Sequence, residues 1–187
     1  MRLAEPSVII LSGNGQSGKT TLLSALVCRL REEGVKVAGI LAEGLWENAV
    51  RSGFNLIDLS DNSSVSLSRR IPDNDLRNGI PFDFYEAGLV AGMKALSPTR
   101  CAGADVVIID EVGYLELQGK GWSSSLQALL EIEGIVHVWA VRRKLLDTVR
   151  AAWGLTASRI VSIEEPDALN RLKIACMSGL GQAKQRR

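Results

Sequence analysis

Cysteine and histidine are scarce in this chain of 187 residues, which has three cysteines and one histidine. Cys28, Cys101 and Cys176 are odd in number and widely separated, and none has a CxxC or Cys/His spacing. This pattern suggests neither a disulfide framework nor a zinc site. We therefore expect reduced thiols in a cytoplasmic protein. His137 is alone in an apolar stretch, where we expect a core or edge residue.

Excess charge and long apolar runs are also missing. The formal net charge is +1, so no strong field draws the chain to nucleic acid or to an anionic membrane. Because no run of about 18 apolar residues occurs, we expect no membrane-spanning helix. The short apolar run near the N-terminus is followed by glycines and a lysine, which indicates a strand instead of a signal peptide. We expect no membrane partner, the sequence gives no support for a nucleic-acid partner, and it leaves a protein partner unknown.

The chain does have a regular alternation of apolar strands and helical stretches. Its 46% of apolar and 23% of charged residues are typical of a packed globular protein, and its length predicts one domain over residues 1–187. Strands separated by helices imply βαβ crossovers. The sequence therefore predicts the α/β class, with a mostly parallel sheet covered by helices on both faces.

The strands expected in the first third of the chain follow short apolar runs. Residues 7–12 (SVIILS) and 35–41 (VKVAGIL) predict two strands, and residues 54–59 (FNLIDL) predict a third that is antiparallel or at an edge. Residues 43–53 are expected to be a connector.

The remaining segments are assigned in the same way. The polar composition from residue 60 predicts an excursion or lid within 60–82, and residues 181–187 predict a flexible basic tail. The other expected elements are helices at 20–34, 85–96, 127–132, 144–153 and 168–177, and strands at 104–110, 136–141 and 159–163.

A glycine-rich phosphate-binding motif follows the first strand. GNGQSGKT matches G-x-x-x-x-G-K-[ST] and lies between a buried strand and a helix, as its mechanism requires. Its glycines let backbone N–H groups approach a triphosphate at a helix N-terminus. We expect Lys19 to hold the β and γ phosphates and Thr20 to bind Mg²⁺. This predicts a P-loop NTPase fold, with nucleotide contacts from Gly13, Asn14, Gly15, Gln16, Ser17, Gly18, Lys19, Thr20 and Thr21.

An acidic pair lies at the end of VVIID, the segment with the strongest strand pattern in the chain. Asp110 and Glu111 would lie at the carboxyl edge of the sheet, where open parallel sheets bind ligands. We expect Asp110 to hold Mg²⁺ through water. We expect Glu111 to orient or deprotonate the attacking water.

Three cations follow the strand VHVWAV at the same predicted edge of the sheet. Arg142, Arg143 and Lys144 open a predicted helix, where positive charge opposes the helix dipole and an anion nearby would relieve the conflict. Either Arg142 or Arg143 is a candidate for an internal arginine finger that stabilises transition-state charge.

Three blocks of the sequence resemble a known P-loop nucleoside-triphosphatase family, typified by a thermophilic bacterial enzyme and a human cancer-related enzyme. The first is the P-loop with its TTL continuation, and the second is DEVGYLEL, similar to DEIGxMEL in the family. The third contains Gly39, Glu43, Arg51, Gly53 and Phe54. Together they run from residue 8 to about residue 117.

The resemblance implies Mg²⁺-dependent hydrolysis of several nucleoside triphosphates, ATP and GTP among them, to diphosphates. It also implies site roles for Glu43, Arg51 and Glu116. The chain departs from the family at Trp46, where relatives commonly carry an arginine, and it lacks a recognisable Gly-Lys-Tyr strand at 79–84. Trp46 is a candidate for stacking on a nucleobase, although a core or surface tryptophan is the simpler interpretation.

Two other functions share the P-loop. A small-molecule or nucleotide kinase needs an acceptor pocket and a lid with arginines, which Arg69, Arg70 and Arg77 would supply. A nucleotide-dependent adaptor, similar to the P-loop partner protein of molybdopterin-guanine-dinucleotide synthesis, has a similar GxGxSGKTTL opening. Glu111 favours water as the acceptor, and the DEVGYLEL block is absent from the adaptor pattern.

Overall fold

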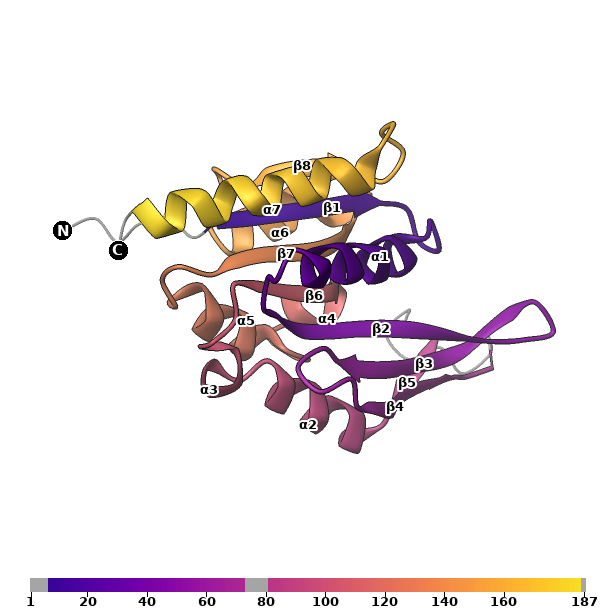
Figure 1. Cartoon of the computed structure of the whole chain (residues 1–187). Helices are drawn as coiled ribbons and strands as arrows, with labels where there is room; N and C mark the ends of the chain where they lie inside the picture. The colour runs from indigo at the N-terminus through magenta and orange to yellow at the C-terminus, as the bar shows by residue number, and fades with distance from the viewer. Residues whose placement is uncertain (1–6, 73–80, 186–187) are drawn as a thin grey trace.

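One sheet of eight strands forms the centre of the molecule (Figure 1). The computed structural model describes residues 7–72 and 81–185. The strand order is β5-β4-β3-β2-β6-β7-β1-β8, and helices pack on both faces. The predicted α/β class, with a mostly parallel sheet between helices, is confirmed.

The phosphate-binding loop follows a strand in the parallel half of the sheet. This half consists of β2, β6, β7, β1 and β8, and each pair of neighbours in that order is parallel. The aliphatic side chains of β1, β6, β7 and the first part of β2 are almost fully buried because helices cover both faces. The bounds are β1 Ser7–Gly13, β2 Val37–Glu47, β6 Val106–Val112, β7 Val136–Arg142 and β8 Arg159–Ser162.

The antiparallel half extends the sheet beyond β2. It consists of β3 Val50–Asp58, β4 Ser64–Arg70 and β5 Phe82–Phe84. The expected connector at 43–53 was wrong, because β2 and β3 continue through it as a hairpin that turns at Asn48 and Ala49. The expected strand at 54–59 is antiparallel but is not at an edge, since β4 and β5 lie outside it.

The segment 60–82 is not an excursion over its described part. Its residues 64–70 pair with β3 as β4, and Phe82 begins β5, which pairs with β4. The part of the expected lid at 73–80 lies outside the described residues, and so does Arg77.

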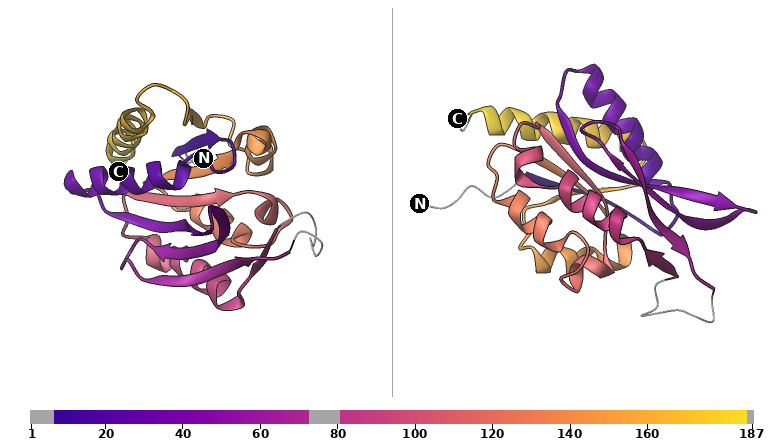
Figure 2. Two further views of the ribbon diagram at one scale, coloured as in Figure 1. Left: turned by 90° about the vertical axis from the view of Figure 1, so that its right-hand side faces the viewer. Right: turned by 90° about the horizontal axis from the view of Figure 1, so that it is seen from below.

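The helices form two groups, one on each face of the sheet (Figure 2). Helices α1 Lys19–Glu32 and α7 Ala168–Gln185 cover one face. The other face is covered mainly by α2 Glu86–Ala95, α3 Pro98–Cys101, α5 Ser123–Leu130 and α6 Leu146–Ala152. The short helices α4 Tyr114–Leu117 and η2 Arg143–Leu145 follow β6 and β7.

The C-terminal helix is longer than the sequence pattern predicts. We expected 181–187 to be a flexible tail, but α7 is helical to Gln185, and residues 186–187 lie outside the described part. Gly179 does not end the helix. A Cβ there would come within 2.9 Å of Ser7 Oγ and Val136 Cγ2, so glycine lets α7 pack closely on the sheet. Within the described residues, no helix is long and apolar enough to cross a membrane.

Candidate functional site

The phosphate-binding loop joins β1 to α1, as its motif requires. Gly18 has φ +89°, a left-handed conformation that favours glycine, and it immediately precedes the first residue of α1. The Ser17 hydroxyl donates a hydrogen bond to Asn14 O at 2.8 Å, which closes the loop on itself. A Cβ on Gly13 would lie 2.5 Å from Ile163 Cγ2, so only glycine fits under the loop.

Lys19 is a buried cation at the first position of α1. Its Nζ donates to Asn14 O at 2.7 Å and to Gly13 O at 3.4 Å. Burial lowers the pKa of Lys19, and the negative charges of Glu111 and Asp110 oppose that effect. The ammonium group is therefore held against the loop, facing two carboxylates.

Asp110 is 1% exposed and lies at the end of the regular part of β6. Its Oδ2 accepts a hydrogen bond from the Ala42 N–H of β2 at 3.1 Å, while Oδ1 is buried without a hydrogen-bond partner of its own. Burial, followed by the charge of Glu111, raises the pKa of Asp110 to about 7; hydrogen bonds from Thr20 and Ala42 oppose the rise.

The pair of Asp110 and Thr20 fits a magnesium ion. Mg²⁺ takes one or two carboxylates, keeps several waters and completes its shell with substrate phosphates. An orphaned carboxylate oxygen beside a hydroxyl meets this need, and a bound cation would offset the cost of burying the charge. No cluster of three His, Cys, Asp or Glu side chains suited to a metal occurs among residues 7–72 and 81–185. The donor set therefore suits a metal that arrives with phosphate ligands.

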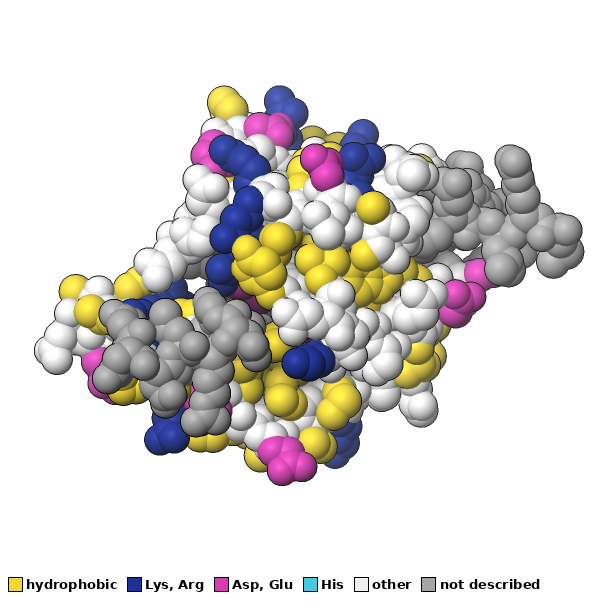
Figure 3. Space-filling view, turned by 180° about the vertical axis from the view of Figure 1, so that it is seen from behind, with side chains coloured by type: hydrophobic (Ala, Val, Ile, Leu, Met, Phe, Trp, Pro, Cys, Tyr) yellow, Lys and Arg dark blue, Asp and Glu magenta, His cyan; other side chains and the backbone are white. Residues whose placement is uncertain are grey.

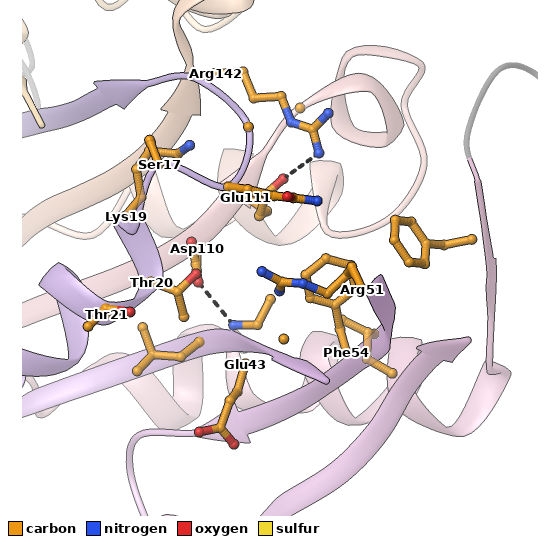
Figure 4. Close-up of a pocket in the computed structure, with 18 of the residues that line it drawn as sticks. Ser17, Lys19, Thr20, Thr21, Glu43, Arg51, Phe54, Asp110, Glu111 and Arg142 are labelled. Atoms are coloured by element: carbon orange, nitrogen blue, oxygen red, sulfur yellow. Dashed lines mark hydrogen bonds and ion pairs between the residues drawn. The ribbon is translucent and has the colours of Figure 1, made fainter. Parts of the chain in front are cut away.

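Glu111 lies where β6 departs from regular strand geometry. Its φ is +65°, and the register between β6 and β7 shifts between Ile109 and Val112. Such bulges re-aim side chains beside functional sites. Arg142 Nη2 donates to Glu111 Oε2 at 3.2 Å, so a carboxylate and a guanidinium face each other above the loop (Figure 4).

The two candidate arginines after β7 occupy different places. Arg142 lines the cavity that contains the phosphate-binding loop. Arg143 points elsewhere, donating to Ser162 Oγ at 3.3 Å and pairing with the Glu164 carboxylate. The structure therefore brings Arg142 to the candidate site and leaves Arg143 outside its lining.

The hairpin formed by β2 and β3 carries the family-implied residues Glu43 and Arg51, together with Trp46. All three line the cavity. The Glu43 carboxylate points away from Asp110 and Glu111 (Figure 4). The Arg51 guanidinium lies 4.2 Å from the Trp46 ring centroid and 5.0 Å from that of Phe54. It therefore lies within cation–π distance of both rings.

Arg51 is held close to the backbone of the hairpin. A Cβ on Gly44 would come 1.3 Å from its Nη1, so Gly44 leaves the space in which the guanidinium lies. Its Nε is buried without a hydrogen-bond partner. Burial lowers the pKa of Arg51, and the charges of Glu111 and Asp110 oppose that change. The result is a cation facing the acidic pair across the cavity.

Glu116 braces the loop that follows Glu111. Its carboxylate accepts hydrogen bonds from Gly113 N at 2.9 Å and from Trp122 N at 3.4 Å, and it is 4% exposed. Burial raises its pKa, and these N–H donors oppose the rise. The family-implied Glu116 thus fixes the path of the chain between β6 and α5.

Several aromatic residues of the cavity were not singled out from the sequence. The cavity has a volume of about 1,400 Å³ and is lined at one end by the loop residues 15–21. Its lining also includes Phe82, Phe84 and Trp122. The alternation of FDF at 82–84 was the available signal, because side chains two apart on a strand share a face.

Comparisons with known proteins bear on this arrangement. A family model described as NTPase matches residues 8–170. Nucleoside-triphosphatase THEP1 of Methanocaldococcus jannaschii is 27% identical over 145 residues, which are 78% of this chain and 79% of that protein. The protein of the same name from Pyrococcus abyssi is 31% identical over 140 residues, which are 75% of this chain and 76% of that protein.

Two solved structures have the same fold. The solution structure of a human cancer-related nucleoside triphosphatase gives a TM-score of 0.70 at 19% identity, and the match covers 95% of this chain and 98% of that one. The crystal structure of THEP1 from the hyperthermophile Aquifex aeolicus gives 0.60 at 18% identity, with 95% and 99% covered. The resemblance inferred from the three sequence blocks is confirmed, and the chain belongs to the NTPase family.

Proposed function

We propose that the protein hydrolyses nucleoside triphosphates, ATP and GTP among them, to diphosphate and phosphate with Mg²⁺ as the cofactor. The observation that carries this proposal is the shared cavity of the phosphate-binding loop, Asp110 and Glu111. A loop that holds phosphates, facing a metal-binding carboxylate and a second carboxylate suited to activate water, is the machinery of phosphoanhydride hydrolysis.

The loop and Lys19 bind the substrate. Backbone N–H groups of residues 15–20 surround the β phosphate at the N-terminus of α1. Lys19 leaves the carbonyls of Gly13 and Asn14 to pair with β and γ oxygens, which are stronger acceptors. Thr20 and Asp110 would hold the magnesium, which would supply positive charge to the phosphates when bound.

Glu111 acts on the attacking water. Its carboxylate orients the water and accepts a proton as the oxygen bonds to the γ phosphorus, and the electrons of the breaking bond leave with the diphosphate. Arg142 lies 3.2 Å from that carboxylate and contributes positive charge on the γ-phosphate side. Arg51 adds a second cation on the same side, held there by Trp46 and Phe54.

The test is turnover of ATP, GTP, CTP and UTP with Mg²⁺. We expect Lys19→Ala to lose nucleotide binding, because it removes the cation of the loop. Glu111→Gln should keep binding but release phosphate about 100-fold or more slowly, since an amide cannot accept the proton. Phosphate release that is absent from wild type, or equal in wild type and Lys19→Ala, would reject the proposal.

We also propose that the protein works in a reducing compartment, the cytoplasm. All three cysteines are free thiols. Burial raises the pKa of Cys101 to about 11 and that of Cys176 to about 12, so these two stay protonated and unreactive.

A further inference from the structure

The cavity is larger than a typical small-molecule site. Small-molecule sites typically enclose about 300–1,000 Å³, and this cavity encloses about 1,400 Å³. The loop, Asp110 and Glu111 account for one part of it. We call a second part the aromatic arm; it consists of Arg51 and Phe54 with the rings that contact them, Trp46 and Phe82.

The aromatic arm lies beyond Glu111 as seen from the phosphate-binding loop. Lys19 and Ser17 lie on one side of the Glu111 carboxylate, and Arg51 and Phe54 lie on the other (Figure 4). In phosphoryl transfer the attacking and leaving oxygens are in line across the γ phosphorus. With Glu111 on the attacking side, the β phosphate, ribose and base of the cleaved nucleotide extend away from it. The arm is therefore on the acceptor side.

The arm has the chemistry of a site for a planar aromatic anion. Phe54 and Phe82 meet edge to face with centroids 5.0 Å apart, and aromatic rings of this kind are the groups on which bases stack. Arg51 supplies a positive charge and a buried Nε without a partner, and it lies between these rings and the acidic pair. Apart from the arm, the surface seen from behind has a column of basic side chains beside a hydrophobic patch (Figure 3).

We propose that the aromatic arm binds a nucleoside monophosphate as a second substrate, which accepts the γ phosphoryl group in place of water. This rests on the placement of the triphosphate under the proposed function. The base lies against Phe54 and Phe82, and Arg51 pairs with the monophosphate.

The transfer step requires no further reactant. An oxygen of the dianionic monophosphate forms a bond to the γ phosphorus as the bond from that phosphorus to the β–γ bridging oxygen breaks. The bonding electrons leave with the donor diphosphate, and the acceptor becomes a second diphosphate. The attacking oxygen carries no proton, so none has to be removed.

The experiment follows the γ phosphoryl group of labelled ATP in the presence of AMP, GMP, CMP or UMP. Label in inorganic phosphate measures the proposed hydrolysis, and label in a second nucleoside diphosphate measures transfer. We expect at least one monophosphate to take up label, and its addition should leave the KM for ATP within about twofold. Label found only in inorganic phosphate with all four monophosphates rejects the second site and leaves the hydrolase intact.

Two variants locate the acceptor. Phe82→Ala truncates a ring of the arm on the edge strand β5, and we expect it to raise the KM for the monophosphate about tenfold, equal to the loss of one stacking contact. Tyr85→Ala is the matched control, because Tyr85 is a neighbouring exposed aromatic residue outside the cavity lining. Melting temperature and the KM for ATP check that both variants are folded. The assignment would be overturned if Phe82→Ala left the KM for the monophosphate unchanged, or if both variants changed it equally. Competition of the monophosphate with ATP would also overturn it.

Discussion

Glu111 combines a chemical task with an unfavourable backbone. A non-glycine residue at φ +65° costs on the order of 1 kcal/mol because its Cβ crowds the backbone. Regular strand geometry after Asp110 would turn the next side chain to the opposite face of the sheet. The bulge lets two consecutive carboxylates serve the same cavity, so the strain is a consequence of the site.

The strain at Glu111 can be measured as a reversal of the usual preference for alanine over glycine. Glu111→Gly should have a free energy of unfolding about 1 kcal/mol higher than Glu111→Ala, because only glycine relaxes at positive φ. Both variants lose the carboxylate and the Arg142 pair, so those effects cancel. Urea unfolding gives the comparison.

The control for this reversal is Glu47, an exposed strand residue of β2 outside the positive-φ positions among the described residues. There the alanine variant should be the more stable of the two, by about 0.5–1 kcal/mol. The same order at both positions would contradict strain at Glu111.

The hairpin of β2 and β3 brings a cation to the acidic pair. It extends beyond the parallel strands (Figure 1) and turns at Asn48 and Ala49, which both have positive φ. Arg51 follows this turn on β3 and pairs in register with Trp46 of β2. The hairpin therefore sets the position of Arg51, and Gly44 leaves room for it.

Gly44→Ala should displace Arg51 without unfolding the hairpin, since the atoms that would clash with the new Cβ are the far end of a flexible side chain. We expect phosphate release to fall about tenfold or more through the lost cation. Arg51→Ala should have a similar effect, and the double variant should be no worse than either single one.

The control is Gly103→Ala, where a new Cβ meets nothing within 4 Å. It should leave turnover and melting temperature unchanged. Additive losses in the Gly44→Ala, Arg51→Ala double variant would show that Gly44 acts by another route.

Strands with two buried faces could be predicted from the sequence, whereas the outer part of the hairpin and β4 could not. β1 and β6 are continuous apolar runs, and the loop motif identifies the start of α1. The outer part of β2 is mostly exposed, and β4 reads SVSLSRR, so neither shows the apolar run of a buried strand. The turn at Asn48 and Ala49 lacks the Asn-Gly pair that most strongly marks a hairpin.

The whole molecule has two cores separated by the sheet, and a titratable side chain is buried between them. His137 in β7 is fully buried, and neither of its ring nitrogens has a hydrogen-bond partner. Burial lowers its pKa to about 4. We expected His137 to be a core or edge residue, and it is a core residue.

His137 should weaken the fold in mild acid. Below pH 6.5 the unfolded chain protonates His137, whereas the folded protein does not do so until about pH 4. The contribution of the neutral histidine to the free energy of unfolding is therefore fully present above pH 6.5 and is lost as the pH falls through this window. Between pH 7 and pH 5 the loss is about 2 kcal/mol. Asp110 has the opposite effect on the free energy of unfolding as the pH falls, because its pKa is raised in the folded protein.

The comparison of His137→Leu with wild type isolates the histidine, since Asp110 is common to both. Between pH 7 and pH 5, the free energy of unfolding should fall by about 2 kcal/mol less in His137→Leu than in wild type. Trp139→Phe, a packing change on the same strand, should lower stability equally at both pH values. Equal pH dependence in His137→Leu and wild type would contradict a neutral buried histidine.

The site is assembled from segments that lie far apart in the sequence, which limits what sequence alone could predict. The loop, Asp110 and Glu111 come from β1 and β6, where motif and strand pattern coincide, and Arg142 from β7 joins them. Arg142 and Arg143 are adjacent and chemically alike in the sequence, and the structure separates them because Arg142 pairs with Glu111 and Arg143 with Glu164. Phe82 and Phe84 reach the cavity through the unexpected antiparallel half.

The tryptophans differ in their contact with water, and this gives the protein an optical reporter of its own. Trp139 and Trp122 are 0% and 5% exposed, whereas Trp46 is 53% exposed at the cavity and stacked against Arg51. Fluorescence from a tryptophan in contact with water is emitted at longer wavelength than fluorescence from a buried one. The long-wavelength edge of the intrinsic emission therefore reports on the cavity. Ligand entry can be followed with a fluorimeter, without any dye or label.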